Sequence, residues 1–156
     1  MKEIILSQNM VSTVDDEDFE LLNKYNWFAQ KSDIRFYAIR NVWANGKHTT
    51  ETMHHLLKGK TGLFVDHIDG NGLNNQKTNL RVCSPQQNNF NRTGNRRNAS
   101  GLKGVRKTDS GKYYAQIRRA GQYYYLGIHK SATEAATIYN AKAKELFGEF
   151  ARLNRV

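Results

Sequence analysis

The sequence predicts an α+β fold in which short antiparallel sheets are combined with a few helices. The main support is the order of the elements along the chain. Residues 64–91 read as strand, tight turn, strand and helix, and residues 103–147 read as three β-rich runs followed by one long helix. The second succession is typical of a three-stranded antiparallel sheet packed on one helix. We therefore expect two small modules rather than one large core.

The N-terminal region is expected to be a scaffold of strands and short helices. A helix is predicted to begin after Asp15 and Asp16 and to run to about Tyr25, because Phe19, Leu22 and Tyr25 recur at three-residue spacing. The other elements expected here are a strand or hairpin over 3–14, strands over 27–30 and 35–43, an Asn45-Gly46 turn and a short helix over 51–58. We assign no chemical role to the side chains of residues 1–50.

Turn and cap residues divide the C-terminal region into its elements. The β-rich runs are 103–107, 112–119 and 122–128, and the turns between them are Ser110-Gly111 and Ala120-Gly121. A helix is predicted to begin at Ser131, where Glu134 completes a capping box, and to end at Gly148. Alternation along the strands directs one set of side chains toward this helix. The set is Val105, Tyr113, Ala115, Ile117, Tyr124 and Leu126.

Basic side chains gather toward the C-terminus of a chain whose formal net charge is +10. Residues 1–65 hold eight basic and eight acidic side chains, whereas residues 101–156 hold eleven basic and four acidic ones. This gradient indicates that the C-terminal part faces a polyanion. No apolar run approaches the roughly 20 residues that span a bilayer, and no predicted helix opposes a basic face to a strongly apolar one. Residues 1–8 are also too short and too polar for a signal peptide.

Residues 66–91 combine a carboxylate, an imidazole and carboxamides, which is the chemistry of a one-metal phosphodiesterase site. Phosphodiester hydrolysis requires an activated water and a cation that neutralises charge on the phosphate and the leaving oxygen. Asp66 offers a hard oxygen ligand, while His67 points to the opposite side of an extended strand and is placed to act as general base. Asn88 in the following helix can supply a second oxygen ligand. Asn79 can bridge backbone groups across the loop.

These residues resemble the motif of the HNH endonucleases, in the variant of phage and intron-homing enzymes. The matching pieces within residues 53–91 are Met53-His54-His55-Leu56-Leu57, Val65-Asp66-His67-Ile68-Asp69-Gly70-Asn71, Asn74-Asn75, Asn79-Leu80-Arg81 and the Asn-rich helix. His67, Asn79 and Asn88 match the three positions of the His-Asn-His motif that gives the family its name, at intervals of 12 and 9 residues. The resemblance implies a ββα-metal fold in which His67 and Asn79 are catalytic. It also implies that Asp66 and Asn88 hold one metal ion.

The last position of the motif is Asn88 rather than a histidine, and this replacement changes which metal ion is expected. A carboxylate and an amide oxygen favour Mg²⁺ or Mn²⁺ over Zn²⁺, with one ion per active site. Asn89 and Asn91 are alternatives to Asn88 as the second ligand. The single cysteine, Cys83, excludes a cysteine-rich zinc knuckle.

Three further residues of this segment have both a structural and a functional interpretation. Asp69 is expected to be a turn residue. One of His54 and His55 is expected to pack against the core, while the resemblance makes His54 an accessory phosphate contact. Arg81 either contacts a phosphate or is an exposed arginine after a strand that needs no function.

The outer face of the C-terminal sheet is the second candidate site. Alternation places Arg106, Gln116, Arg118, Tyr123 and Tyr125 on this face, with Lys103 and Thr108 near the ends of the first strand. Arginine pairs bidentately with guanine, and glutamine pairs with adenine, in a DNA groove. An ordinary exposed polar face is the alternative interpretation.

Residues 101–154 resemble the plant Apetala, or ethylene-response-factor, DNA-binding domain. The matching pieces are Gly104-Val105-Arg106, Gly111-Lys112, Ala115-Gln116-Ile117-Arg118, Tyr125-Leu126-Gly127, Thr133-Glu134-Ala135-Ala136, Tyr139-Asn140 and Phe147-Gly148. The resemblance implies a three-stranded sheet laid in the major groove. The base and phosphate contacts that it implies are Lys103, Arg106, Gln116, Arg118, Tyr123 and Tyr125. Several of these differ in type from the plant pattern, so the resemblance carries the docking mode but not the recognised sequence.

The sequence therefore predicts a metal-dependent DNA endonuclease of homing or phage type. Residues 1–92 are expected to be the scaffold and nuclease domain, 93–100 a linker and 101–154 the DNA-binding domain. The expected partner is double-stranded DNA, and no membrane association is expected. The protein is expected to be a monomer or weak dimer in the cytoplasm of a bacterial or phage-infected cell. One alternative is a non-cleaving DNA-binding regulator with a vestigial nuclease motif. Another is an RNA-binding protein that stacks bases on its tyrosines.

Overall fold

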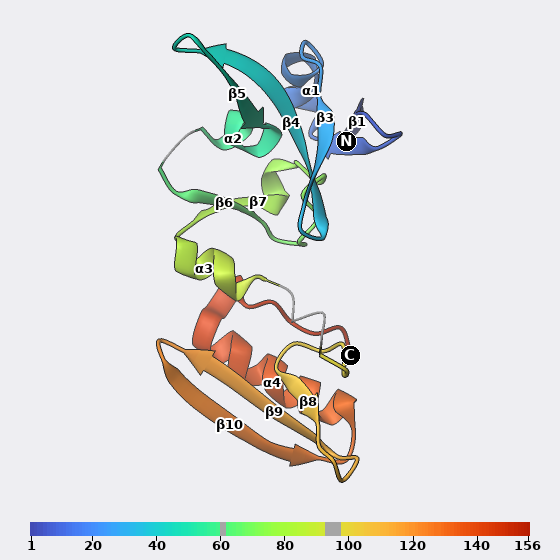
Figure 1. Ribbon diagram of the computed structural model, residues 1–156, viewed down its shortest axis with the longest axis vertical. Coiled ribbons are helices and arrows are strands. Elements are labelled where there is room, and N and C mark those ends of the chain that lie inside the picture. The colour runs from blue at the N-terminus through green and yellow to red at the C-terminus, as the bar shows by residue number, and fades with distance from the viewer. Residues whose placement is uncertain (60–61, 93–97) are drawn as a thin grey trace. The chain divides into compact units, whose positions relative to one another are not determined.

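The structure, a computed structural model, describes residues 1–59, 62–92 and 98–156. The chain divides into two units, Met1–Asn88 and Asn89–Val156, and each unit has its own buried hydrophobic cluster. The mixed α and β fold is confirmed, with several small antiparallel sheets and four α-helices among the described residues (Figure 1). The unit boundary lies four residues before the predicted domain boundary at residue 92. Most of the predicted linker, residues 93–97, lies outside the described residues.

The N-terminal unit begins with a hairpin and a short helix. β1 (Lys2–Ile5) pairs antiparallel with β2 (Val11–Val14), and α1 (Asp16–Leu22) follows. The predicted helix is three residues too long, because the Leu22 carbonyl accepts the indole hydrogen of Trp27 at 2.8 Å. Asp15 does not cap α1 through its side chain. Its carboxylate instead accepts the backbone N–H of Lys77 at 2.7 Å, which ties this hairpin to a distant part of the chain.

A three-stranded antiparallel sheet supports the centre of this unit. It consists of β3 (Phe28–Ser32), β4 (Arg35–Ala44) and β5 (Lys47–Thr52), and β5 leads directly into α2 (Met53–Lys58). The turn between β4 and β5 has positive φ at both Asn45 (51°) and Gly46 (71°), as the Asn-Gly pair predicts. The sequence interpretation missed β5, whose residues are mostly polar and exposed.

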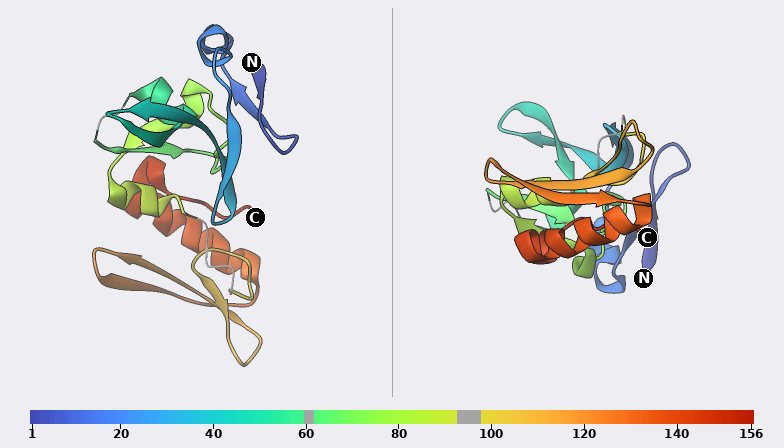
Figure 2. Two further views of the ribbon diagram at one scale, coloured as in Figure 1. Left: turned by 45° about the horizontal axis from the view of Figure 1, so that its top comes forward. Right: turned by 90° about the horizontal axis from the view of Figure 1, so that it is seen from below.

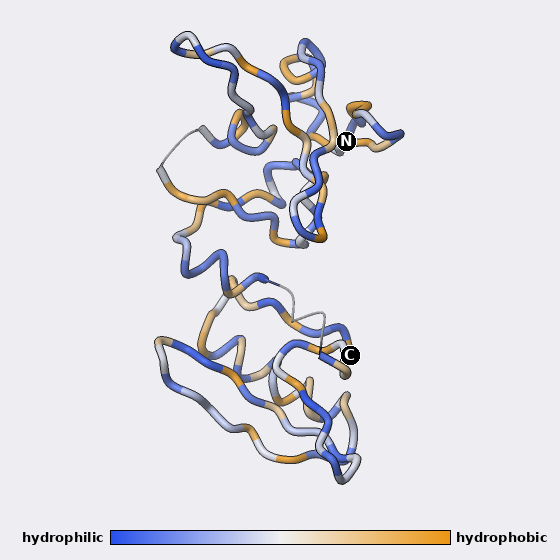
Figure 3. Tube along the Cα trace, viewed as in Figure 1, coloured by the Kyte–Doolittle hydropathy of each residue, from blue (hydrophilic) through white to orange (hydrophobic). Residues whose placement is uncertain are grey.

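The segment with the predicted catalytic residues has the expected order of strand, turn, strand and helix. β6 (Phe64–His67) pairs antiparallel with β7 (Leu80–Cys83), after the 3₁₀ turn η1 (Lys77–Asn79), and α3 (Pro85–Phe90) follows. Ser84 and Gln87 form a capping box at the start of α3, with hydrogen bonds of 2.8 and 3.2 Å. α3 buries none of its residues and is hydrophilic along most of its length (Figure 3).

The N-terminal hairpin also pairs with the loop that joins β6 to β7. Thr13 of β2 forms a parallel bridge with Asn74. The Thr13 backbone N–H donates to the Leu73 carbonyl at 2.9 Å, and the Asn75 N–H donates to the Thr13 carbonyl at 2.8 Å. The loop over 73–75 is therefore held as an additional short strand beside β2.

The C-terminal unit is a three-stranded antiparallel sheet with one helix. The strands are β8 (Val105–Lys107), β9 (Tyr113–Arg119) and β10 (Gln122–His129), with β9 in the centre. α4 (Ala132–Phe147) lies along one face of this sheet and is followed by the turn η2 (Gly148–Phe150) (Figure 2). Ser131 caps α4 by accepting the Glu134 N–H at 3.1 Å.

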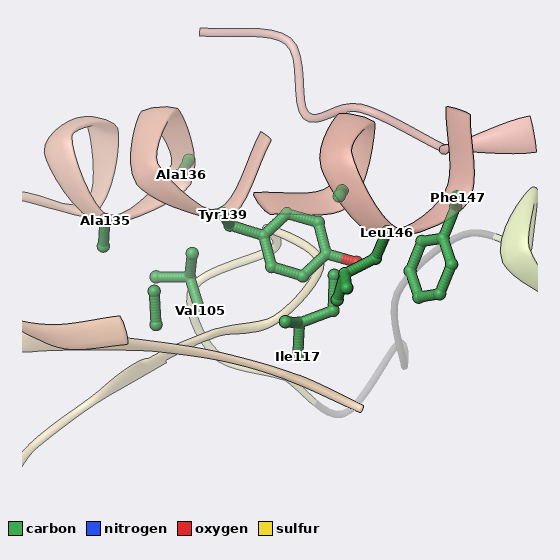
Figure 4. Packing of buried hydrophobic residues seen from close by; sticks show 9 residues of the cluster. Val105, Ile117, Ala135, Ala136, Tyr139, Leu146 and Phe147 are labelled. Carbon is green, nitrogen blue, oxygen red and sulfur yellow. The ribbon is translucent and has the colours of Figure 1, made fainter. Parts of the chain in front are cut away.

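The core of the C-terminal unit lies between the sheet and α4. Val105 and Ile117 meet Tyr139 and Leu146 of the helix there (Figure 4). Ala115 is also fully buried in this cluster. The remaining residues predicted to face the helix, Tyr113, Tyr124 and Leu126, pack against the same cluster, so the predicted helix-facing set is confirmed.

A β-bulge interrupts the alternation of β10. Tyr125 lies opposite Gln116, but Ile128 lies opposite Tyr114, so β10 has one extra residue between these pairs. Gly127 supplies the positive φ of 90° at this point. The bulge moves Ile128 to the same face as Tyr114 and Gln116, where it is 56% exposed.

Within the described part of the chain, no helix combines the length and the apolar character needed to cross a membrane.

Candidate functional site

β6 holds Asp66 and His67 on opposite sides of the hairpin. Asp66 lies opposite Arg81 of β7, and its Oδ2 accepts hydrogen bonds from the Arg81 Nε at 3.1 Å and Nη2 at 2.8 Å. Only 3% of Asp66 is exposed. Because the strand alternates, His67 is directed to the other side, which is covered by α2 and β4.

His67 is surrounded by polar and aromatic side chains and is 4% exposed. Its Nε2 lies 3.2 Å from the Asn75 Oδ1. Its ring lies edge-on to His54 of α2, with 5.0 Å between centroids, and is tilted against Tyr37 of β4 at 5.9 Å. The imidazole is therefore fixed in orientation by contacts on several sides.

Burial keeps both of these histidines neutral. Desolvation lowers the pKa of His67, although the hydrogen bond with Asn75 and the charges of Asp69 and Asp66 act in the opposite direction. Desolvation, together with the neighbouring His67 and His55, lowers the pKa of His54 to about 3. A neutral imidazole retains one basic nitrogen, which is the state a general base requires.

Asn79 organises the turn after β6. Its Oδ1 accepts the Asp69 backbone N–H at 3.0 Å, and its Nδ2 donates to the Asn74 carbonyl at 2.8 Å and the Asp69 Oδ1 at 3.0 Å. Asp69 is a turn residue, as predicted, since its Oδ1 also accepts the Asn71 N–H at 2.7 Å. Partial burial opposes ionisation, but these hydrogen bonds hold the pKa of Asp69 below its usual value.

The three asparagines considered as the second metal ligand have different environments. Asn88 is half-buried in α3, and its backbone N–H donates to the Ser84 carbonyl at 3.0 Å. Asn89 is exposed, and Asn91 is only 2% exposed. Asn88 is the last residue of the N-terminal unit, which also contains Asp66, whereas Asn89 and Asn91 belong to the C-terminal unit. The assignment to Asn88 stays a prediction.

The Asp66 carboxylate on β6 is a hard oxygen donor of the kind that divalent cations such as Mg²⁺ prefer. Among the described residues, no group of three or more histidine, cysteine, aspartate or glutamate side chains is arranged to hold a metal. The predicted site would combine the Asp66 carboxylate with an amide oxygen, and waters or phosphate oxygens would complete the coordination. Mg²⁺ is commonly bound in this way. Any such cation would bind a carboxylate that already forms an ion pair with Arg81, whose Nη2 lies 2.8 Å from the Asp66 Oδ2.

Two residues predicted to contact phosphate are instead engaged inside the N-terminal unit. His54 is 7% exposed and contacts His67 and Tyr37, so it packs in the core rather than at an open surface. Arg81 lies within β7 rather than after it, and 12% of its side chain is exposed. Arg81 would have to leave Asp66 to reach a phosphate.

The outer face of the C-terminal sheet presents cationic and aromatic side chains. Arg106 and Arg118 are exposed, Tyr123 and Tyr125 are each 65% exposed, and Gln116 is half-buried. The Arg118 guanidinium lies over the Tyr123 ring, 4.9 Å from its centroid. The register pairs Arg118 with Tyr123 and Gln116 with Tyr125. The expected outer-face set is thus observed, apart from Lys103.

Lys103 differs from the expectation of an outer-face contact. Its ammonium donates to the Phe90 carbonyl at 2.6 Å, and its backbone N–H donates to the Asn154 Oδ1 at 2.7 Å. Burial and the nearby Arg152 lower the pKa of Lys103 to about 8. The Lys103 ammonium is therefore engaged within its own unit, where it donates a hydrogen bond to the carbonyl of Phe90, the last residue of α3.

Sequence reasoning missed several residues that belong to these sites. Tyr114 joins the outer face, with its ring centroid 6.3 Å from that of Tyr125. Asn75 and Ser12 form a hydrogen-bonded chain that leads to His67. The Asn74-Asn75 pair is part of the recognised motif, but only the fold reveals that Asn75 reaches the imidazole. Ser12 had no signal in the sequence.

Comparisons with known proteins identify the family. A family model described as HNH endonuclease matches residues 58–90. The chain is 35% identical over 144 residues to an uncharacterized HNH endonuclease of Acanthamoeba polyphaga mimivirus, and the match covers 90% of this chain and 72% of that protein. It is 34% identical over 92 residues to Protein 3.8 of Escherichia phage T7, covering 58% of this chain and 75% of that protein. The chain belongs to the HNH endonuclease family, which indicates a nuclease.

Proposed function

We propose that the protein is a divalent-metal-dependent DNA endonuclease of homing or phage type with a ββα-metal active site on β6, β7 and α3. The observation that carries this proposal is the pair Asp66 and His67, adjacent on a strand of the segment matched by the family. Burial on both sides of the hairpin leaves a carboxylate facing one way and a neutral imidazole facing the other. Both groups are held by hydrogen bonds within the N-terminal unit.

Each residue has a defined role in the proposed hydrolysis. Asp66 and Asn88 would hold one Mg²⁺ or Mn²⁺ ion, with Asn89 and Asn91 as alternatives to Asn88. The bound ion would neutralise charge that develops on the scissile phosphate and on the departing 3′ oxygen. His67 accepts the proton of the attacking water, and Asn79 holds the turn that fixes β6 against β7. The products carry a 5′ phosphate and a 3′ hydroxyl.

The C-terminal sheet is proposed to bind duplex DNA through its outer face. The support is the row of Arg106, Gln116, Arg118, Tyr123 and Tyr125 on a face opposite α4, together with the positive charge of this part of the chain. The resemblance of residues 101–154 to the Apetala domain suggests docking in the major groove. This binding would localise the enzyme on DNA in the cytoplasm of a bacterial or phage-infected cell.

A non-cleaving DNA-binding regulator is the alternative function. The observation in its favour is that Arg81 occupies Oδ2 of Asp66 and that His67 is 4% exposed, which restricts access to both groups. Against it, Asp66, His67, Asn79 and Asn88 are all present, and a vestigial site has no chemical reason to retain the complete set.

Incubation with supercoiled plasmid separates the two functions. The nuclease is expected to relax or linearise the plasmid with Mg²⁺ or Mn²⁺ and to leave it intact with a chelator. Relaxation alone would indicate one nick per event by a monomer, whereas direct linearisation would indicate that two chains act together. Binding of the plasmid without any cleavage in either metal would instead support the regulator.

A further inference from the structure

Two fully buried polar side chains connect the N-terminal hairpin to His67. Ser12 of β2 and Asn75 of the loop between β6 and η1 are both 0% exposed. The Asn75 Nδ2 donates to the Ser12 Oγ at 2.8 Å, and the Asn75 Oδ1 lies 3.2 Å from the His67 Nε2. Polar side chains without water access require definite donors and acceptors, so the hydrogens in this chain can be assigned.

The Ser12 hydroxyl determines the direction of the chain. Its Oγ lies 2.9 Å from the Leu73 carbonyl oxygen, and a carbonyl has no hydrogen to give. The Met53 thioether sulfur lies 3.3 Å from the same Oγ and has no hydrogen to give either. The hydroxyl hydrogen is therefore directed at these acceptors and away from Asn75, because two oxygens 2.9 Å apart without a hydrogen between them would repel each other. The Ser12 Oγ is then an acceptor toward Asn75.

The orientation of the Asn75 amide follows from this assignment. Oxygen and nitrogen of a carboxamide are chosen from the hydrogen-bond network rather than seen directly. Since the Ser12 Oγ accepts, the amide group facing it must be the NH₂, and the carbonyl oxygen must face His67. A neutral imidazole approached by a carbonyl oxygen at Nε2 must carry its hydrogen on that nitrogen.

Backbone hydrogen bonds on both sides of Asn75 hold this residue in place beside His67. The Asn75 N–H donates to the Thr13 carbonyl at 2.8 Å, and the Thr13 N–H donates to the Leu73 carbonyl at 2.9 Å. The parallel bridge between Thr13 and Asn74 lies between them. The loop therefore approaches His67 as part of a small sheet with β2.

We propose that Ser12 and Asn75 are positioning residues that fix the tautomer of His67 with its hydrogen on Nε2, so that Nδ1 is the basic nitrogen. The proposal rests on the proposed role of His67 as general base. It gives the N-terminal hairpin a task in the reaction, since β2 supplies Ser12 and holds the loop that carries Asn75. Which nitrogen of a histidine is basic is commonly set by the hydrogen bond at the other nitrogen.

The tautomer can be measured in the full-length protein without metal or DNA. Long-range ¹H–¹⁵N correlation spectra at neutral pH distinguish a protonated from an unprotonated ring nitrogen, and loss of one signal set in His67→Gln assigns the residue. We expect a protonated Nε2 and an unprotonated Nδ1. Protonation at Nδ1, or a mixture of the two forms, would overturn the proposal. The tautomer itself is read from the wild type, and His67→Gln serves only to assign the signals.

A matched pair of substitutions tests Ser12. Threonine and valine have nearly the same shape, so Ser12→Thr and Ser12→Val crowd the buried site equally, and only the first retains a hydroxyl. Ser12→Thr is expected to keep the wild-type tautomer. Ser12→Val is expected to give a mixture, because the Asn75 amide can then turn over. Equal spectra for both variants would contradict the proposal.

Asn75→Leu removes the hydrogen-bond acceptor at His67 itself. We expect mixed tautomers and a kcat for plasmid cleavage lower by roughly tenfold to a hundredfold, with KM for DNA almost unchanged. An unchanged tautomer in this variant would overturn the proposal. If the wild type itself cleaves no DNA with Mg²⁺ or Mn²⁺, the proposed function fails, while the spectra still decide the tautomer.

Discussion

At the scale of the residue, the two groups proposed to act in hydrolysis, Asp66 and His67, are buried on opposite sides of one short hairpin. The sequence predicted that Asp66 and His67 point in opposite directions, because alternation in a strand requires it. It did not predict the partner of either group. Arg81 reaches Asp66 because β6 and β7 pair in a particular register, and His54 reaches His67 because α2 packs over β6. Neither contact has a local signal in the sequence.

Replacing the proposed base should separate cleavage from binding. His67→Ala is expected to lower the rate of plasmid cleavage by about 10²- to 10⁴-fold, because the attacking water loses its proton acceptor. Affinity for DNA, measured by gel shift, should stay nearly the same. His48→Ala is the control, since His48 is exposed beside Trp43 on the β4–β5 hairpin. Undiminished cleavage by His67→Ala would remove this residue from the mechanism.

His54 should make the protein sensitive to acid. Burial lowers its pKa to about 3 in the folded protein, while an unfolded chain binds the proton at a pKa near 6.5. The unfolded state therefore binds more protons between these values, and the free energy of unfolding falls as pH decreases from about 6.5 to about 3. The slope for one proton is at most about 1.4 kcal/mol per pH unit.

The contribution of His54 can be isolated by comparing thermal unfolding at pH 7 and pH 4.5. His54→Phe retains a ring for the contacts with Tyr37 and His67 but has no titratable nitrogen. We expect this variant to lose less stability on acidification than the wild type. An equal loss in the wild type and the variant would mean that other groups account for the pH dependence.

At the scale of the element, most of the fold follows from local patterns. Caps, Asn-Gly and Gly turns, and alternation predicted the C-terminal sheet, α4 and the set of residues between them. The bulge at Gly127 was not predicted, because strict alternation would place Ile128 with Tyr124 and Leu126. β5 was missed because its residues are mostly polar and show little alternation, so the pairing with β4 has no local signal in the sequence. Lys103 was misplaced because its partner, the Phe90 carbonyl, is distant in sequence.

Gly104 should be essential for packing of the C-terminal sheet on α4. Its φ is +74°, and a Cβ at this position would lie 2.1 Å from the Tyr139 ring and 2.7 Å from the Gln116 carbonyl oxygen. Gly104→Ala is expected to destabilise the unit by on the order of 2 to 4 kcal/mol, from backbone strain and overpacking together. Urea unfolding, followed by far-UV circular dichroism, measures this change in the free energy of unfolding.

Gly111→Ala provides the matched control for Gly104→Ala. Gly111 has a similar φ of +80°, but a Cβ there would meet nothing within 4 Å. Its substitution should cost only the backbone strain of about 1 to 2 kcal/mol. If the two variants are destabilised equally, the contact between Gly104 and Tyr139 contributes nothing.

At the scale of the whole molecule, the chain combines two units with separate cores and an uneven distribution of charge. The basic excess toward the C-terminus and the exposed arginines of the sheet favour binding of a polyanion by that unit. The residues proposed to act on the phosphodiester, in contrast, belong to the N-terminal unit, residues 1–88, which holds ten basic and ten acidic side chains. Localisation and hydrolysis are therefore proposed to depend on different surfaces.

Salt dependence should reveal the binding surface. If the sheet neutralises about six phosphates, the logarithm of DNA affinity is expected to fall with the logarithm of salt concentration at a slope near −5. Arg118→Ala should weaken binding and make this slope shallower by about 1, without changing the metal dependence of cleavage. Lys144→Ala is the control, because Lys144 is an exposed cation on α4 rather than on the sheet. An unaltered slope in Arg118→Ala would exclude the outer face as the DNA contact.

The bridge between Thr13 and Asn74 joins positions 61 residues apart in the chain, and this separation has a consequence for assembly. Closing so long a loop is entropically unfavourable until the contacts that reward it are made. The contacts between β2 and residues 73–75, which hold Asn75 beside His67, therefore cannot form until the chain has been synthesised beyond Asn75. If His67 acts as proposed, an emerging chain is expected not to cleave nearby DNA until its N-terminal unit is complete.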